Sequence, residues 1–209
     1  GVNGVLDRFG QIEPKLICAC TDYFYNGKHI NCIPRLKEIQ REIKSLDAMV
    51  TFSLESSVSS TLESTISFES LCENNAEEIN FVQLPFDHPL YIMYSSGTTG
   101  QPKCIVHSAG GSLIQHLKEH QLHTNIKPTD VVFYYTTCGW MMWNWLVSVL
   151  ASEATIVLYD GSPFFSSPSI LLDIAEREKI SIFGVSAKYI SAIEKQDIEP
   201  VKTHRLEHM

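Results

Sequence analysis

The segment Leu90-Tyr-Ile-Met-Tyr-Ser-Ser-Gly-Thr-Thr-Gly-Gln-Pro-Lys-Cys-Ile-Val-His107 places a Gly/Ser/Thr-rich turn between two apolar stretches. Residues 90–94 and 104–107 have the apolar character that is typical of buried strands. Gly97 and Gly100 let the backbone turn tightly and direct bare N–H groups at an anion. The segment therefore predicts a strand, a phosphate-binding turn and a second strand.

The side chains of this turn also favour a polyanion as ligand. Lys103 supplies a mobile positive charge for phosphate oxygens. The turn adds hydroxyl donors from Ser95, Ser96, Thr98 and Thr99. It is not a P-loop, because Gly100 is followed by Gln101-Pro102 rather than by Lys and Ser or Thr. A surface turn that binds nothing is the alternative, and the trailing Pro-Lys and the two flanking strands disfavour it.

Strands and helices alternate on both sides of this segment, which indicates an α/β fold with a largely parallel sheet. Periodicity predicts strands at 15–20, 47–52, 131–135, 154–158 and 180–183. It predicts helices at 34–45, 108–123, 140–150, 168–179 and 187–195.

The chain divides by composition into three parts. Residues 1–52 form an α/β segment. Residues 53–80 are rich in Ser, Glu, Thr and Asn and bury little apolar area, so we expect an exposed linker, disordered in part, with a short helix near 68–72. An acidic functional tail is the less favoured alternative for this stretch. Residues 81–209 form the core that carries the turn.

Composition excludes several classes of protein. The 209 residues are 44% hydrophobic and 19% charged, as in ordinary globular proteins. The net charge of −8 argues against a nucleic-acid-binding surface. No apolar run approaches the roughly 20 residues of a membrane span; the longest, 140–151, contains Asn144 and Ser148. The chain begins without Met and without a signal peptide, so we expect a cytosolic protein whose natural start lies upstream.

Cysteine and histidine spacing does not favour a metal site. The six cysteines form no CxxC pair, and we expect reduced, buried thiols. His116, His120 and His123 share one face of the predicted helix, but Lys118 and Glu119 intervene. We therefore expect a solvated helix face there rather than a metal site, and we expect His107 to be structural.

The turn also resembles a known signature. Tyr94 to Lys103 matches the pattern [YF]-x-S-G-[ST]-T-G-x-P-K of the adenylate-forming superfamily, although most members have Gly where this chain has Cys104. Ile105 to Gly111 resembles the acetyl- and acetoacetyl-CoA synthetase branch, and Gly139-Trp-Met-Met-Trp-Asn-Trp145 resembles the acetoacetyl-CoA synthetases in particular. Further similar segments lie at 4–15, 159–163 and 184–190, so the resemblance covers nearly all of the chain except 53–80.

The resemblance implies part of the large N-terminal domain of the adenylate-forming fold, a layered, mostly parallel sheet with flanking helices, without the C-terminal lid domain. It implies ATP-dependent ligation of acetoacetate to coenzyme A through an acyl-adenylate, with release of AMP and pyrophosphate. The implied ATP-binding residues are Ser95, Ser96, Gly97, Thr98, Thr99, Gly100 and Lys103, with Thr98, Thr99 and Lys103 catalytic. Mg²⁺ and coenzyme A are implied without assignable residues.

The same resemblance suggests an acyl pocket formed by Trp140, Met141, Met142, Trp143 and Asn144. The alternative is a helix whose aromatic and methionine side chains pack in the core. The family's adenine-binding segment, ribose-binding Asp and lid Lys are not in this sequence, so the 209 residues alone are expected to be inactive. A short-chain synthetase acting on acetate or propionate, and a truncated relative that binds proteins, remain as alternatives. A role in making lipids from ketone bodies is what the family suggests.

Overall fold

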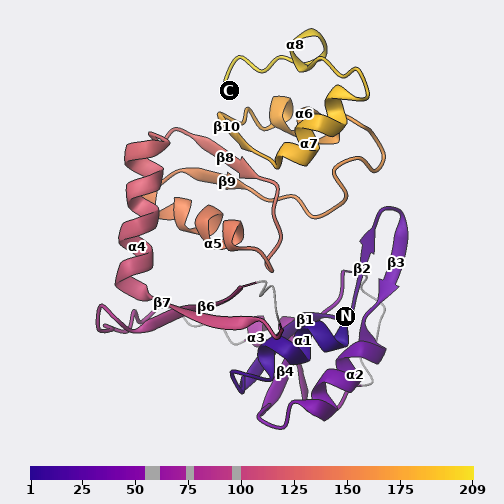
Figure 1. The fold of residues 1–209 in the computed structure, drawn as a ribbon, viewed down its shortest axis with the longest axis vertical. Coiled ribbons are helices and arrows are strands. Elements are labelled where there is room, and N and C mark those ends of the chain that lie inside the picture. The colour runs from indigo at the N-terminus through magenta and orange to yellow at the C-terminus, as the bar shows by residue number, and fades with distance from the viewer. Residues whose placement is uncertain (55–61, 74–77, 96–99) are drawn as a thin grey trace. The chain divides into compact units, whose positions relative to one another are not determined.

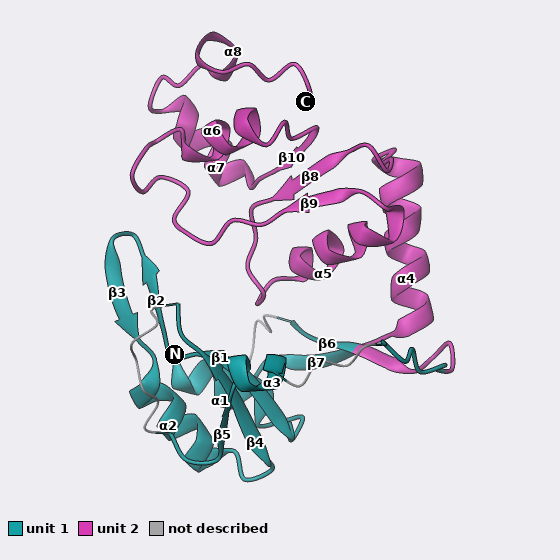
Figure 2. Cartoon of the chain, turned by 180° about the vertical axis from the view of Figure 1, so that it is seen from behind, with its two compact units in different colours: residues 1–84, 91–106 teal, residues 85–90, 107–209 magenta. Residues whose placement is uncertain are grey.

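The computed structural model describes residues 1–54, 62–73, 78–95 and 100–209. The chain forms two compact units, residues 1–84 with 91–106 and residues 85–90 with 107–209, shown in Figure 2. Both units contain parallel sheets with flanking helices, which confirms the predicted α/β fold. No helix in the described part of the chain has the length and apolar character needed to cross a membrane.

The first unit is built on a three-stranded parallel sheet in the order β1-β4-β5. Its strands are β1 (Leu16–Cys20), β4 (Ala48–Phe52) and β5 (Thr65–Ser67). An antiparallel hairpin joins β2 (Asp22–Tyr25) to β3 (Lys28–Asn31). The helices are α1 (Val2–Phe9), α2 (Ile33–Glu42) and α3 (Phe68–Glu73).

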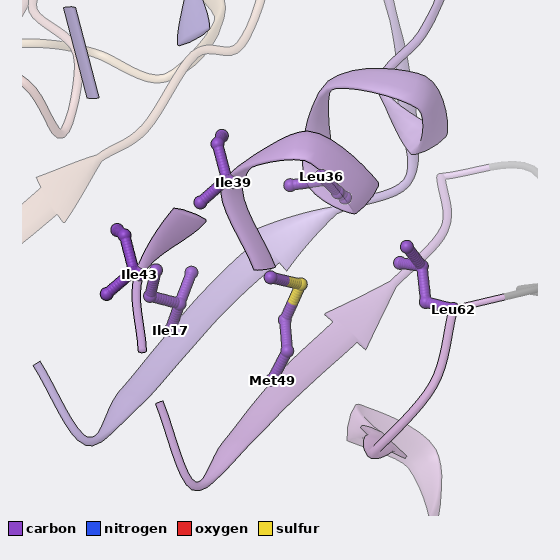
Figure 3. Packing of buried hydrophobic residues seen from close by; sticks show 6 residues of the cluster. All are labelled: Ile17, Leu36, Ile39, Ile43, Met49 and Leu62. Carbon is purple, nitrogen blue, oxygen red and sulfur yellow. The ribbon is translucent and has the colours of Figure 1, made fainter. Parts of the chain in front are cut away.

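The core of this unit forms where α2 packs on the sheet (Figure 3). Leu36, Ile39 and Ile43 recur at the three- and four-residue spacing that places side chains on one helix face. They pack against Ile17 of β1 and Met49 of β4. Leu62 completes the cluster. The helical periodicity predicted in the sequence therefore produces the main apolar contact of the unit.

The second unit has the parallel strand order β10-β8-β9. Its strands are β8 (Val131–Tyr134), β9 (Thr155–Val157) and β10 (Ile182–Gly184). Helix α4 (Ala109–Leu117) continues into a π-helix, η1 (Lys118–His123), and α5 (Met141–Ser148) continues into a 3₁₀ turn, η2 (Val149–Ser152). The remaining helices are α6 (Ile170–Arg177), α7 (Ala187–Glu194) and α8 (Pro200–Thr203).

Adjacent side chains of β8 point into two different apolar clusters, one on each face of the sheet. Val132 packs with Trp145 and Leu146 of α5, whereas Phe133 packs with residues of α6 and α7. Successive strand residues point to opposite faces of a sheet, so α5 covers one face and α6 and α7 cover the other. Figure 1 shows this arrangement, with α5 on one side of β8 and β9 and with α6 and α7 on the other.

Strands β6 (Pro89–Ser95) and β7 (Lys103–Ser108) pair as a two-stranded sheet on either side of the predicted phosphate turn. The sequence analysis missed five elements: α1, the hairpin strands β2 and β3, β5 and α8. The hairpin had a local signal, because Asn26-Gly27 at its turn adopts positive φ at both residues, as two-residue hairpin loops require.

The prediction of buried cysteines is wrong. All six thiols are free, but Cys18, Cys72, Cys104 and Cys138 are exposed and only Cys20 and Cys32 are partly covered. Most of the cysteines lie either in connecting segments or on strands with one face in solvent. Their apolar character therefore does not bury them.

Candidate functional site

The two strands β6 and β7 fix the ends of the predicted phosphate turn. Ser95 is the last residue of β6 and Lys103 is the first residue of β7. Ser96, Gly97, Thr98 and Thr99 lie outside the described residues. Of the predicted ATP-binding set, the structure therefore places Ser95, Gly100 and Lys103.

Helix α1 and the turn after it hold both ends of this loop. The Tyr94 hydroxyl donates a hydrogen bond to the Arg8 carbonyl at 3.1 Å. The Gln11 amide donates to the Pro102 carbonyl at 2.9 Å, and its oxygen accepts from the Cys104 thiol at 3.5 Å. Burial raises the pKa of Tyr94, so its hydroxyl remains a neutral donor at neutral pH.

Sequence reasoning did not identify Arg8 and Gln11 as supports of the turn. They precede the turn by about 90 residues, and a contact at that separation has no local signature. The available signal was the family resemblance of residues 4–15, which gave no role to individual side chains.

Lys103 leaves its charge unpaired within the described part of the chain. Its side chain is exposed and forms no ion pair with any described residue. A Cβ placed on Gly100 would meet no described atom within 4 Å, so packing does not require glycine there. An exposed ammonium group without a described partner is compatible with the predicted phosphate turn.

The segments that follow the three strands of the second unit lie close together at the carboxyl edge of its sheet. Tyr135, just after β8, donates through its hydroxyl to the Gly161 carbonyl at 2.9 Å and through its backbone N–H to the Gly184 carbonyl at 2.8 Å. Its ring lies 6.4 Å from the ring of Tyr159, between centroids. The segments that follow β8, β9 and β10 thus converge, and this edge is where parallel sheets bind ligands.

Helix α5 begins beside this edge, and the five predicted acyl-pocket residues differ in how far their side chains are exposed. Trp140 and Met141 are 70% and 53% exposed at the start of the helix. Met142 packs against the buried cluster around Val132, and Trp143 and Asn144 are partly covered. Two of the five are thus presented to solvent, whereas Met142 has the packing role considered as the alternative.

The prediction of a solvated histidine face on α4 and η1 is wrong. His123 is exposed and His116 is partly covered, but His120 is fully buried at 0% exposure. The His120 Nε2 atom lies 3.1 Å from the Trp145 carbonyl oxygen of α5. Burial lowers the pKa of both His116 and His120. Among the described residues no three His, Cys, Asp or Glu side chains come close enough to hold a metal ion.

A cavity of about 470 Å³ lies in the first unit, between α2 and the start of β4. It is lined by Lys37, Gln40, Arg41, Leu46, Asp47, Ala48, Glu63 and Ser64. Ala48 is the first residue of β4, so the cavity is at the amino end of this parallel strand. Ligands of open parallel sheets bind at the carboxyl ends, and we assign no ligand to this cavity.

Comparison with known proteins extends these observations. The family model described as "AMP-binding enzyme" matches residues 8–208. Acetoacetyl-CoA synthetase of Gallus gallus is 48% identical over 99% of this chain and 32% of its own length. Acetoacetyl-CoA synthetase of Rhizobium meliloti (strain 1021) has the same identity and coverage. A malonamoyl-CoA synthetase of Penicillium aethiopicum is 42% identical over 94% of this chain and 30% of its own length.

The fold is also similar to a solved structure. Acetoacetyl-CoA synthetase from Streptomyces lividans superposes with a TM-score of 0.94 and 42% identity, over 100% of this chain and 32% of that one. The chain thus spans about a third of the length of the relatives it matches.

Proposed function

This chain belongs to the AMP-binding enzyme family, and on that premise we propose that it is part of an acetoacetate–CoA ligase that forms AMP. The observation that carries the proposal is the 48% identity to acetoacetyl-CoA synthetases over 99% of the chain. Similarity of this extent includes both the phosphate turn and the start of α5.

The proposed reaction has two steps. A carboxylate oxygen of acetoacetate attacks the α-phosphorus of ATP, and pyrophosphate leaves. The thiolate sulfur of coenzyme A then attacks the acyl carbon of the adenylate, and AMP leaves with the electron pair of the broken C–O bond. The first step needs donors for the negative charge that develops on the departing pyrophosphate.

We assign this role to the turn between β6 and β7. Lys103 donates to the phosphate oxygens, and the hydroxyls of Thr98 and Thr99 are proposed to act with it. Ser95, Ser96, Gly97 and Gly100 complete the proposed ATP-binding set. Tyr94 and Gln11 support the assignment, because they hold the two ends of the turn and so reduce the reorganisation required on binding. Mg²⁺ supplies additional neutralisation of phosphate charge when bound, and no residue of this chain is assigned to it.

The acyl group is proposed to bind at the start of α5. Trp140, Met141, Met142, Trp143 and Asn144 form the proposed set, with direct contact from the exposed Trp140 and Met141. Acetoacetate and malonamate both carry a carbonyl group at C3, and relatives named for each acid are similar to this chain. The Trp140 indole N–H has no partner among the described residues, and it is our candidate donor to that carbonyl.

The setting of the reaction is also part of the proposal. The substrates would be acetoacetate, ATP and coenzyme A in the cytosol, with the product available for fatty-acid and sterol synthesis. The 209 residues alone are proposed to be inactive, because they correspond to only 32% of the length of the acetoacetyl-CoA synthetase of Gallus gallus.

Pyrophosphate release by the full-length protein tests this proposal. We expect acetoacetate to be used with a higher kcat/KM than malonamate, acetate or propionate. Lys103→Ala should lower the adenylation rate about 100-fold, since removal of one transition-state donor costs 10²–10³ in rate. Lys195→Ala, at an exposed position after α7, is the matched control and should retain activity.

Other outcomes separate the alternatives. Preference for acetate or propionate would identify a short-chain synthetase, and preference for malonamate would identify a different 3-carbonyl acid as the substrate. No pyrophosphate release with any acid would overturn the proposal and would favour a non-catalytic relative.

A further inference from the structure

Three side chains on one face of α4 and η1 hold α5 by directional hydrogen bonds. Glu119 and His120 follow His116 by three and four residues, so each lies next to His116 on the helix surface. Their partners are Trp145 and Ser148, which are on the part of α5 that faces α4. We refer to these five residues as the α5 clamp.

His120 forms the buried centre of the clamp. A carbonyl oxygen only accepts, so the Nε2 atom that lies 3.1 Å from the Trp145 carbonyl must carry the proton. The Nδ1 atom of this neutral ring then bears a lone pair, and it has no partner among the described residues. The imidazole also contacts the Trp145 indole edge-on, with ring centroids 4.6 Å apart at 76°. The backbone and the side chain of Trp145 are thus both engaged.

Glu119 and His116 add two further bonds. The Trp145 indole N–H donates to Glu119 Oε2 at 3.2 Å, and Gln115 holds the other carboxylate oxygen at 2.6 Å. The Ser148 hydroxyl is hydrogen-bonded to His116 Nδ1 at 2.7 Å. Trp145 and Ser148 are three residues apart, so the hydrogen bonds of the clamp span almost one full turn of α5.

The composition of α5 explains why directional bonds are needed. Met141-Met-Trp-Asn-Trp-Leu-Val-Ser148 is apolar on nearly all sides, with only Asn144 and Ser148 carrying a short polar side chain. A helix with a distinct apolar stripe is oriented by burial of that stripe, but burial alone discriminates poorly between rotations of a helix that is apolar all round. His120 and Trp145 are buried and Glu119 is partly covered, and polar groups in such a contact cost more to desolvate than leucines would. The directional hydrogen bonds that these groups form offset the desolvation cost and fix the rotation of α5 about its axis.

We propose that His116, Glu119 and His120 are positioning residues of the acyl site, which set the rotation of α5 and so the direction in which Trp140, Met141 and Asn144 face. Residues along a helix are rotated by about 100° each, so a small rotation at Trp145 displaces the side chains at the start of the helix. This inference rests on the proposed function, since it takes the start of α5 to be the acyl site.

Acid is expected to release the clamp. Burial is the main cause that lowers the pKa of both imidazoles from 6.5. The ionisable groups that act on the pair are Glu119 and His107, while α5 and η2 carry none. As the pH falls below about 6.5, the unfolded chain takes up protons before the folded one, so stability decreases until the folded-state pKa is reached. A proton on His120 Nδ1 would find no acceptor there.

Kinetics of the full-length protein test the inference through paired variants. His120→Leu and Glu119→Leu remove the bonds, while His120→Gln and Glu119→Gln keep a donor to the Trp145 carbonyl and an acceptor for its indole. We expect the leucine variants to raise the KM for acetoacetate about tenfold, the size expected for one lost hydrogen bond, with the KM for ATP unchanged. The glutamine variants should restore the wild-type KM. His123→Leu, at the exposed end of η1, is the control.

A pH series adds a second readout. The KM for acetoacetate should rise in wild type as the pH falls from 7.5 to 5.5, and this rise should be reduced in His120→Gln. Equal losses of kcat for every acid, with both KM values unchanged, would show that these residues only maintain the folded fraction, and would overturn the inference. Absence of ligase activity in the wild type would instead overturn the proposed function, and the positioning role would fall with it.

Discussion

Asp22 is a buried carboxylate at the carboxyl edge of the first unit's sheet. It is 1% exposed and accepts hydrogen bonds from the hydroxyls of Thr21 at 3.0 Å and Ser53 at 2.6 Å. His29 Nε2 lies 3.1 Å from its second oxygen. The bond from Ser53 is the main cause that lowers the pKa of Asp22, against the opposing effect of burial. One side chain thus connects the ends of β1 and β4 with the β2–β3 hairpin.

The lowered pKa predicts a specific loss of stability in acid. Because the folded-state pKa of Asp22 lies below the ordinary 3.8, its contribution is complete above that pH and is lost as the pH falls through the folded value. Asp22→Asn should lower the free energy of unfolding at pH 7 by about 2 kcal/mol, since an amide nitrogen replaces one acceptor oxygen. Urea unfolding at pH 7 and pH 3 measures both effects.

Asp47→Asn is the matched control for this prediction, because Asp47 is exposed and in the same unit. It should leave the free energy of unfolding within about 0.5 kcal/mol of wild type. Equal stability of the Asp22 and Asp47 variants would show that the buried network contributes nothing net.

At the scale of elements, the contact between β8 and β10 depends on a glycine. A Cβ added at Gly184 would lie 2.2 Å from Tyr134 Cδ2 in the neighbouring strand. The Tyr134 ring cannot readily move away, because it lies edge-on against Trp145 with centroids 6.1 Å apart. The close approach of the two strands at this position therefore requires a residue without a side chain.

Gly184→Ala should accordingly lower the free energy of unfolding by about 2 kcal/mol, within the range known for overpacked positions. Gly4→Ala is a useful comparison, since the added Cβ would lie 3.6 Å from the Arg8 side chain in ordinary contact. Gly4 is inside α1, so the change to Ala should be neutral or stabilise by up to about 1 kcal/mol. Chemical denaturation of both variants measures these free energies. An unchanged free energy of unfolding in Gly184→Ala would contradict the steric argument.

Elements that form through contacts between residues close in sequence were predicted, whereas elements that depend on a distant partner were not. The helix at 34–45 and the strands at 131–135 and 180–183 carry their own periodicity, and α2, β8 and β10 confirm them. Strand β5 carries little apolar pattern, and it forms because its backbone pairs with β4. That pairing depends on a partner strand and not on the side chains of Thr65–Ser67.

At the scale of the whole molecule, many large apolar side chains are left in solvent. Phe81 is 81% exposed and Val201 is 85% exposed. Others more than 70% exposed are Ile79, Val82 and Leu122. Exposed apolar surface of this kind marks regions that bind other protein surfaces or cause association.

The 209-residue chain alone should therefore associate. Sedimentation velocity should give a mass that rises with concentration above the 23.6 kDa of one chain, and the chain should enhance the fluorescence of a hydrophobic dye. The full-length protein at equal concentration should bind less dye per residue. A dye-silent 209-residue monomer at high concentration would contradict this prediction.

The sequence by itself determined the α/β fold, the family and the position of the Gly/Ser/Thr-rich turn, because each depends on residues that are adjacent along the chain. The tertiary structure alone decided which residues support those features. His120 has the spacing of a solvated helix face, but Trp145 covers it from 25 residues away. Gln11 likewise supports a turn that begins more than 80 residues later. Burial and hydrogen bonding depend on what packs against a residue, and that information is not local to its position.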